Sequence, residues 1–500
     1  MISAILVLCC LFVGAVLYQR SKKRENGRSI PGPNQFMTLQ NLATHRFKGF
    51  HKWVEQLGQT YGDIVSFSIL DKTFVFLNNE RLIKKALVDD GVKDFLWERP
   101  PSIFRDRLIP NDILFSCNKD EQQAMRKIFH KSLSVYGDGV SKFESVVCKE
   151  LEVLCQRIEN QKGADFCMFD FIKDSLSNLI SVLMSGERFD DDTDDVKLFW
   201  HWDVLADKLL HPINVTILAF MPFLQHMPGP LGNTSREFEK TQNKIYDIFY
   251  YKMKRTHVPG HTRGIVDVLL DIQEEQRAQG ITWFTEQHVL SIIINIIGAG
   301  LITSSDTLGT FFLNLVYQPE VQQKILKEVI REIGPRRHPE VKDRKNLPYT
   351  HATILENLRC LSVLPLSLPH KASQEIVLDG FIIPKDSFVL PNLWVLHHNA
   401  DVYEDPYTFN AERFLDDEGN LVPPEDIKRH TLMPFGIGRR QCPGESFART
   451  RLFLYISKLV QQFEFLPPND SILPKWDPRF YQHNLSITPP SYMCRAKQRN

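Results

Sequence analysis

One cysteine near the end of this 500-residue chain stands in a sequence frame that could hold a ligand. Cys442 lies in 435-FGIGRRQCPGE-445, among glycines and arginines. The glycines allow positive φ angles and let the backbone approach a flat molecule closely. A Pro-Gly step follows, and an amphipathic helix is predicted over 445–460, so the thiol would lie just before a helix N-terminus. The helix dipole is expected there to lower the pKa of the thiol and to favour thiolate.

Arg440 is placed to pair with an anionic group beside this cysteine. A flat molecule, a thiolate and an anion partner together indicate haem, held by an iron–sulfur bond and a propionate contact. From these residues alone, a buried structural cysteine in a glycine-rich turn remains the ordinary alternative. The chain has nine cysteines, an odd number, with no Cys-x-x-Cys pair. This pattern favours free thiols in a reducing compartment over a disulfide framework or a structural zinc site.

The pattern Phe435-x-x-Gly438-x-Arg440-x-Cys442-x-Gly444 resembles the haem-binding signature of the cytochrome P450 family. The resemblance implies that Cys442 is the axial thiolate ligand of haem b and that the four other positions contact the cofactor. It extends from about residue 61 to 465. The segments 406–414 and 443–465 look most like the microsomal branch, which handles steroids, fatty acids and foreign compounds.

A second landmark of the family is a carboxylate with two arginines. The segment 356-ENLR-359 resembles the family's Glu-x-x-Arg pair, and Arg413 matches the arginine that completes the triad. Spaced three residues apart on a helix, Glu356 and Arg359 share a face and can bond. A buried carboxylate with two guanidiniums is costly unless fully hydrogen-bonded, so we expect a role in folding rather than in chemistry.

Two further positions resemble the family's propionate-binding residues. Arg126 matches one of them, but the tryptophan expected four residues earlier is Gln122 here, which puts one haem contact in doubt. His370, in 369-PHKA-372, matches a second propionate partner of microsomal members.

The family's central helix usually carries two small residues, an acid and a threonine, and here it reads 298-GAGLITSSDT-307. Ala299 and Gly300 match the small residues, which leave room for oxygen above the iron. Thr303 matches the threonine that handles oxygen and protons. The position of the acid is occupied by Ile302.

Asp306 offers one replacement for the missing acid. It lies one helical turn after Ile302 on nearly the same face, so it, or a chain of water molecules, could supply protons towards Thr303. The equally open alternative is that Asp306 bonds within the helix or points away.

These residues need elements to position them. The longest predicted helix begins at Thr285, a good N-cap, and ends at Tyr317 before Gln318-Pro319. It is apolar on every side over 289–302, which favours a central core helix over a membrane span. Strands are predicted over 64–70 and 73–79 and a small sheet region over 361–392, with helices over most of 119–335 and 444–461. The expected fold class is α+β and mainly helical. The resemblance implies the P450 fold, a triangular helical prism with a small β-rich portion.

The N-terminus predicts a membrane anchor. The segment 1-MISAILVLCCLFVGAVLY-18 carries no charged side chain and is followed by 20-RSKKRENGR-28. Eighteen helical residues reach roughly 27 Å, enough to cross a bilayer core. The positive charges follow the apolar run, unlike those of a cleaved signal peptide. We expect an anchor over 1–19, a basic and proline-rich linker over 20–35, and a catalytic domain over 36–500 on the cytosolic side of the endoplasmic reticulum.

Taken together, the resemblance implies a monooxygenase that inserts one oxygen atom from O2 into a lipophilic substrate. Its electrons would come from NADPH through cytochrome P450 reductase, with cytochrome b5 as a further partner. The equal numbers of basic and acidic residues, 60 each, give no indication of nucleic acid binding. A basic rim that would suit an acidic reductase is predicted from Lys127, Lys131, Lys428, Arg429 and Arg439, although solvated surface charge accounts for these residues nearly as well.

Ile302 and Gln122 keep two other functional classes open. One is an oxygen-independent haem-thiolate isomerase or lyase, and the other is a non-catalytic haem-binding relative.

Overall fold

The computed structural model describes residues 28–45, 49–136, 141–189, 194–211, 214–215, 217–218 and 221–499. The chain divides into two compact units. Unit 1 comprises Met1–Pro100, Leu366–Leu396 and Ile437–Arg440, and unit 2 comprises Pro101–Pro365, His397–Gly436 and Gln441–Asn500. The predicted anchor over 1–19 and most of the predicted linker over 20–35 lie outside the described residues.

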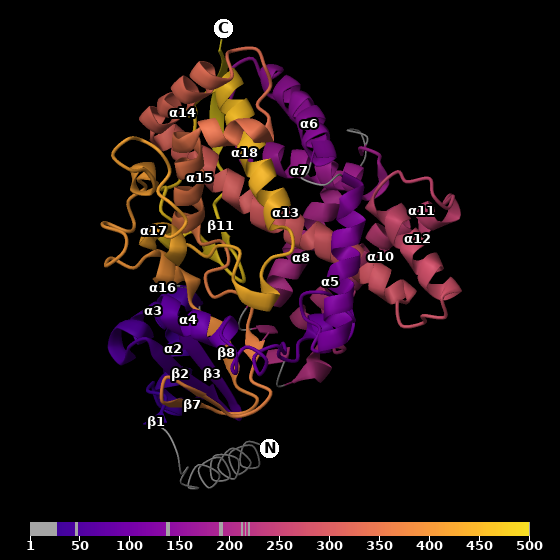
Figure 1. The fold of residues 1–500 in the computed structure, drawn as a ribbon, viewed down its shortest axis with the longest axis vertical. Helices are drawn as coiled ribbons and strands as arrows, with labels where there is room; N and C mark the ends of the chain where they lie inside the picture. Colours follow the sequence, from indigo (N-terminus) through magenta and orange to yellow (C-terminus); the bar gives the residue numbers. More distant parts are fainter. Residues whose placement is uncertain are drawn as a thin grey trace. The chain divides into compact units, whose positions relative to one another are not determined.

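Unit 1 is built on two small sheets with the strand orders β2-β3-β8-β5 and β1-β7-β6. β3 and β8 are parallel and pair Phe74 with Phe388, so strands from opposite ends of the sequence, indigo and orange in Figure 1, lie side by side. The strands are β1 Arg28–Ser29, β2 Ile64–Ile69, β3 Lys72–Leu77, β5 His370–Lys371, β6 Ile376–Leu378, β7 Phe381–Ile383 and β8 Phe388–Pro391.

The helices of unit 1 are α2 Gln35–His45, α3 Phe50–Tyr61, α4 Glu80–Leu87 and α16 Leu393–His397, the last of which ends at the unit boundary. Aromatic rings join α3 to the sheet, with ring centroids of Trp53 and Phe67 4.9 Å apart. The end of the predicted linker also belongs to this unit, because Ser66 donates its N–H to the carbonyl of Pro31 at 2.8 Å.

Unit 2 is mainly helical, which confirms the expected mainly helical α+β class. Its small sheets have the orders β4-β12-β9 and β10-β11. The helices are α5 Lys119–Leu133, α6 Ser141–Glu159, α7 Met168–Ser185, α8 Asp195–Leu210, α10 Pro230–Tyr246, α11 Lys252–Arg255, α12 Ile265–Ala278, α13 Glu286–Tyr317, α14 Pro319–Glu332, α15 Pro348–Leu361, α17 Ile427–Thr431 and α18 Glu445–Gln462. The strands are β4 Phe166–Cys167, β9 Phe463–Leu466, β10 Gln482–His483, β11 Ile487–Thr488 and β12 Met493–Gln498.

Helix α13 is the axis of unit 2, and it packs against α7, α8, α12, α14, α15 and α18 (Figure 1). Thr285 caps it, as predicted, and donates its backbone N–H to Nδ1 of His288 at 3.2 Å. The helix is long and apolar enough to cross a membrane, but 72% of its most apolar window is buried inside the structure. The prediction of a central core helix is therefore supported.

The carboxylate of Glu356 and two arginines form a buried network within unit 2. Arg359 donates to both oxygens of Glu356 at 2.7 Å, and neither side chain is exposed. Arg413 donates its Nε to the same carboxylate at 3.3 Å. The guanidinium of Arg359 also donates to the carbonyls of His397 and Pro406, at 2.8 and 2.7 Å. The network thus joins α15 to the segment that follows α16. The charged groups of Glu356, Arg359 and Arg413 have hydrogen-bond partners within it.

We predict that Glu356→Gln destabilises the protein strongly, because it leaves the Arg359 guanidinium buried without its carboxylate. Breaking such a buried pair costs about 3–5 kcal/mol. Urea unfolding followed by far-ultraviolet circular dichroism measures the effect. The matched control is Glu412→Gln, whose carboxylate forms an exposed ion pair with Lys324 and should cost less than about 1 kcal/mol. Equal losses in the two variants would contradict the prediction.

Candidate functional site

The loop that carries Cys442 is closed by its own backbone. The N–H of Cys442 donates to the carbonyl of Phe435 at 2.9 Å. Gly436 and Gly438 have φ of 69° and 74°, a left-handed conformation that glycine adopts without strain. Gly444 immediately precedes α18, and a Cβ built there would lie 4.0 Å from the Cys442 sulfur. The sulfur therefore lies beside the N-terminus of α18.

The pKa of Cys442 departs from the expectation based on the sequence. The side chain is exposed, yet the surrounding protein desolvates the sulfur enough to raise its pKa above the ordinary value. The backbone N–H of Gly444 and the cations Arg126 and Arg451 act in the opposite direction. The predicted lowering is wrong for the free thiol, because desolvation outweighs the favourable dipoles. A coordinating metal ion would deprotonate the thiol directly.

The middle of α13 presents an accessible face within unit 2. From His288 to Val316 the helix is buried except at Ile296, Ala299, Gly300, Ile302 and Thr303. Among them, Ala299 is exposed and the others are half-buried. The spacing of 296, 299, 300 and 303 places these residues on one side of the helix. The predicted residues Ala299, Gly300 and Thr303 therefore lie together on the accessible stretch of a helix that is otherwise buried between His288 and Val316.

The hydroxyl of Thr303 is held by its own helix. It donates to the carbonyl of Ala299 at 2.8 Å, and the carbonyl of Thr303 in turn accepts from the hydroxyl of Thr307 at 2.7 Å. A threonine hydroxyl that bonds to the carbonyl four residues earlier can rotate and exchange that partner for another acceptor.

Asp306 is buried and belongs to an acidic group between α13 and its neighbours. Its carboxylate accepts a hydrogen bond from the hydroxyl of Thr488 at 3.2 Å. Burial and the nearby Asp203 raise the pKa of Asp306 well above its ordinary value, against the opposing charge of Lys173. Burial of this kind favours the protonated form of the carboxyl. Its bonded partner is Thr488 rather than Thr303.

Arg126 on α5 lies next to the cysteine loop, where its guanidinium donates to the carbonyl of Gln441 at 2.9 Å. Gln122, one turn earlier, is fully buried. Its amide nitrogen donates to the carbonyl of Ile113 at 3.2 Å. Its buried Oε1 has no hydrogen-bond partner among the described residues. The residue that replaces the expected tryptophan therefore keeps an unused acceptor.

His370 and Arg440 lie in unit 1. His370 is buried, with Nδ1 2.7 Å from the carbonyl of Leu96. Burial and the charge of Arg99 lower its pKa well below the ordinary value, so the ring is neutral and carries its proton on Nδ1. An anion at Nε2 would favour a second proton. Arg440 donates to the carbonyl of Trp97 at 3.1 and 3.2 Å and stacks on its ring.

Sequence reasoning missed one charged residue near the cysteine. Arg451, on α18, is buried, and its guanidinium donates to the carbonyl of Gly300 at 3.0 Å and to the hydroxyl of Ser304. It therefore joins the helix after Cys442 to the accessible stretch of α13. A lone arginine among apolar residues in 450-TRLFLYISKLV-460 was the only signal in the sequence.

The residues of unit 2 fit a haem–thiolate site. Cys442 supplies an exposed sulfur, and the exposed Ala299 leaves one face of α13 uncovered where every neighbouring turn is covered. Nε of Arg451 and Oε1 of Gln122 are among the buried polar atoms of this unit that have no hydrogen-bond partner in the described residues. Soft thiolate ligation with cations nearby suits an iron porphyrin.

Comparison with known proteins decides the family. The family model for cytochrome P450 matches residues 30–495. The chain belongs to the cytochrome P450 family. It is 32% identical over 431 residues to cytochrome P450 2U1 of Bos taurus, covering 85% of this chain and 77% of that protein. It is 29% identical to steroid 17-alpha-hydroxylase/17,20 lyase of Ictalurus punctatus, over 90% of this chain and 87% of that one. It is 28% identical to cytochrome P450 2D14 of Bos taurus, over 99% of this chain and 98% of that one.

Membership of the cytochrome P450 family identifies the chain as a monooxygenase, and members of the family bind haem through a cysteine thiolate. The fold agrees with this assignment, because a mainly helical unit with small sheets is the architecture that the resemblance implied.

We predict that Gly438→Ala destabilises the protein more than Gly436→Ala. Both residues have positive φ, which costs about 1–2 kcal/mol for alanine. A Cβ at Gly438 would also overlap the backbone carbonyl of Leu87, whereas a Cβ at Gly436 would meet no atom within 4 Å. Thermal unfolding should show the larger loss of Tm for Gly438→Ala, and equal losses would contradict the packing at Leu87.

We predict a pH-dependent gain in stability for Asp306→Asn. Because folding raises the pKa of Asp306 above its ordinary 3.8, its contribution to stability is full below pH 3.8 and is lost as pH rises towards the folded-state pKa. The variant should therefore gain on the natural protein as pH rises from 4 to 8, by up to about 1.4 kcal/mol per pH unit until the folded-state pKa is passed.

Urea unfolding at several pH values measures the effect, and Asp267→Asn is the control, because the pKa of Asp267 is shifted in the opposite direction. Asp267 is equally buried, but hydrogen bonds from Arg263 and His257 overcome desolvation and lower its pKa. Because its contribution is already full above the ordinary pKa of 3.8, the stability lost on its replacement should stay nearly constant from pH 5 to 8 and shrink only as pH falls below 3.8. If the stability differences of the two variants from the natural protein changed with pH in the same way, the raised pKa of Asp306 would be refuted.

Proposed function

We propose that this cytochrome P450 binds haem b through Cys442 and inserts one oxygen atom from O2 into a lipophilic substrate, with electrons from NADPH delivered by cytochrome P450 reductase. The observation that carries the proposal is the accessible face of α13, where Ala299 and Thr303 interrupt a buried helix in the unit that also holds the exposed Cys442 thiol.

Bound haem b would supply the oxygen-activating iron, with electron density pushed from the cysteine sulfur. The protein positions that sulfur through the closed loop and the N–H of Gly444. Thr303 offers a hydroxyl on the open side of α13 that can hold or pass a proton. Arg126, Arg440 and His370 are proposed as partners of the propionates, and Phe435, Gly438 and Gly444 as contacts of the porphyrin, on the strength of the family signature.

Asp306 is proposed as a proton reservoir for the reaction. Its raised pKa favours the protonated form of the carboxyl, which a donor requires. Its bond to Thr488 means that a proton would reach Thr303 only through further groups or water. Asp306→Asn should therefore lower the amount of product formed per NADPH consumed. Unchanged coupling would remove Asp306 from the mechanism.

A lipophilic substrate suits the surroundings of Ala299. The half-buried neighbours Ile296 and Ile302 present apolar side chains on or beside the same accessible stretch. One relative is named as a steroid 17-alpha-hydroxylase/17,20 lyase, which is consistent with a steroid-sized apolar substrate for this chain.

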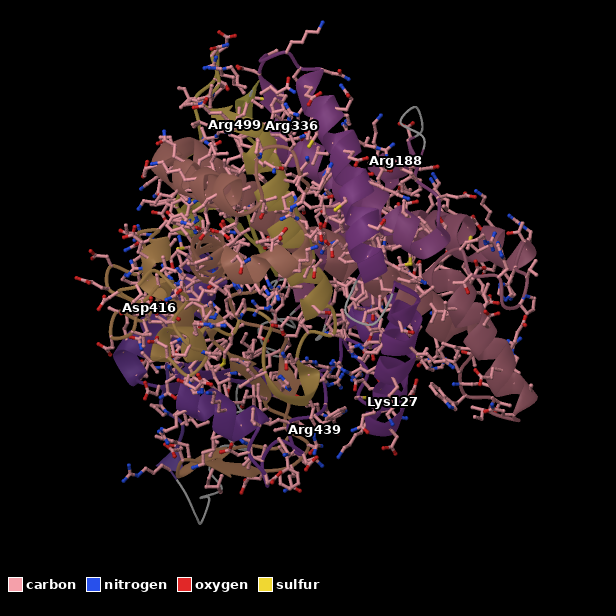
Figure 2. The ribbon with its side chains drawn as sticks, turned by 45° about the horizontal axis from the view of Figure 1, so that its top comes forward. Lys127, Arg188, Arg336, Asp416, Arg439 and Arg499 are labelled. Atoms are coloured by element: carbon pink, nitrogen blue, oxygen red, sulfur yellow. The ribbon has the colours of Figure 1, made fainter. Side chains whose placement is uncertain are left out.

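The proposed redox partners are an acidic reductase and cytochrome b5. Lys127 is exposed on α5 and is labelled in Figure 2, as is the exposed Arg439 of unit 1. Two of the predicted basic residues are already neutralised in part, because Lys131 pairs with Glu275 and Arg439 with Asp94. The proposed location is the endoplasmic reticulum membrane, on the basis of the apolar segment over 1–19.

The first test is the absorption spectrum of the reduced protein with carbon monoxide. We expect the strongly red-shifted Soret band that cysteinate ligation produces, and its loss in Cys442→Ser. A band at the ordinary position in the natural protein would contradict thiolate ligation, and a protein without haem would favour a non-catalytic relative. Reductase-dependent O2 uptake with a lipophilic substrate then distinguishes the monooxygenase from an oxygen-independent isomerase or lyase.

A further inference from the structure

A buried guanidinium joins the helix after the cysteine loop to the accessible stretch of α13. Arg451 lies in the second turn of α18, and only 6% of its surface is exposed. Its terminal nitrogen donates to the carbonyl of Gly300 at 3.0 Å and to the hydroxyl of Ser304. These bonds attach α18 to the turn of α13 that contains Ala299 and Thr303.

The charge of Arg451 lacks an acidic partner. No ion pair links it to a carboxylate in the part of the chain that the structure describes, and its buried Nε has no hydrogen-bond partner there. Tyr455 and Cys442 act on its charge. The helix also places Cys442 near it. Gly444, where a Cβ would lie 4.0 Å from the Cys442 sulfur, is about two turns before Arg451 on the same face of α18, and helical side chains lean towards the N-terminus. A buried cation without a counter-charge costs several kcal/mol, so one of these neighbours should bear a negative charge in the working protein.

Tyr455 does not supply that charge. Its hydroxyl lies 2.8 Å from the hydroxyl of Ser175, and burial raises its pKa far above neutral pH. Cys442 remains as the neighbour that becomes anionic, because a metal ion deprotonates the thiol that ligates it. Arg126 also acts on this sulfur, but Arg126 is only half-buried and is partly screened by solvent.

We infer that Arg451 is a positioning residue for the iron ligand, a buried positive charge that balances the Cys442 thiolate while its hydrogen bonds fix α18 against the middle of α13. This inference rests on the proposed function, because it requires Cys442 to ligate iron. A cation close to the ligand stabilises the reduced, more negative state of the iron and raises its reduction potential, as net charge and neighbouring donors do at other thiolate-bound iron centres.

The test compares the ferric/ferrous midpoint potentials of full-length haem-loaded variants. Arg451→Met removes the charge and should shift the one-electron equilibrium about tenfold towards ferric, which is 59 mV to the negative. Arg451→Lys keeps the charge and should keep the potential of the natural protein. If Arg451→Met does not fold, Arg451→Gln replaces it, because its amide can still donate to the Gly300 carbonyl while the charge is gone.

The matched control is Lys458→Met, which removes another buried cation from the same helix. The electrostatic neighbours of Lys458 are Cys155, Glu152, Cys148 and Glu159 rather than Cys442, so the potential should not change. An Arg451→Met or Arg451→Gln protein with the natural potential would overturn the inference. An Arg451→Lys protein whose midpoint potential is as negative as that of Arg451→Met would also overturn it. In that case the hydrogen bonds of Arg451, rather than its charge, would set the potential.

Different results would overturn the proposed function and the role of Arg451. If the natural protein lacks the red-shifted carbon monoxide band, the proposed function fails and the inference on Arg451 fails with it. If the band is present and the potential is insensitive to the charge at 451, only the inference fails.

Discussion

The desolvation of charge inside unit 2 is the constraint on which the rest of the structure depends. Helix α13 is apolar on every side over most of its length and can be buried only if other helices surround it. Any ionisable group in that shell must find a partner or change its protonation state. The polar residues around α13 show several ways of meeting this requirement, and each has a chemical consequence.

Glu356 and Arg359 meet the requirement by pairing. Both oxygens of the carboxylate and every part of the guanidinium make short contacts, so full charges persist in a dry environment. Such a network holds backbone segments in one arrangement but has no free group with which to react. Because its charged groups already have hydrogen-bond partners, the network serves folding rather than catalysis.

Asp306 and Cys442 meet the requirement by a shift of their pKa values that favours the protonated form. Neither has a full counter-charge bonded to it, and burial raises the pKa of both. A protonated acid can donate, and a protonated thiol becomes a ligand when a metal ion displaces its proton. Arg451 cannot give up its proton near neutral pH, so it remains a buried cation that is balanced once the sulfur becomes anionic. The groups left incompletely satisfied in the free protein are thus those on which the proposed chemistry relies.

The sequence by itself determined the elements and the local frames. Hydrophobic periodicity, helix-capping residues and helix-breaking prolines predicted the helix from Thr285 to Tyr317, the strands near 64–79 and the helix after Gly444. These features depend only on neighbours in the chain. The spacing in 435–444 likewise predicts Cys442 as the iron ligand. Only the tertiary structure decided the state of the charges. The helix dipole suggested a lowered pKa for Cys442, but desolvation by burial reversed the direction of the shift. The buried position of Arg451 beside Gly300 arises from packing between α18 and α13. Desolvation and long-range charge depend on what lies nearby in space, and local sequence does not encode that distance.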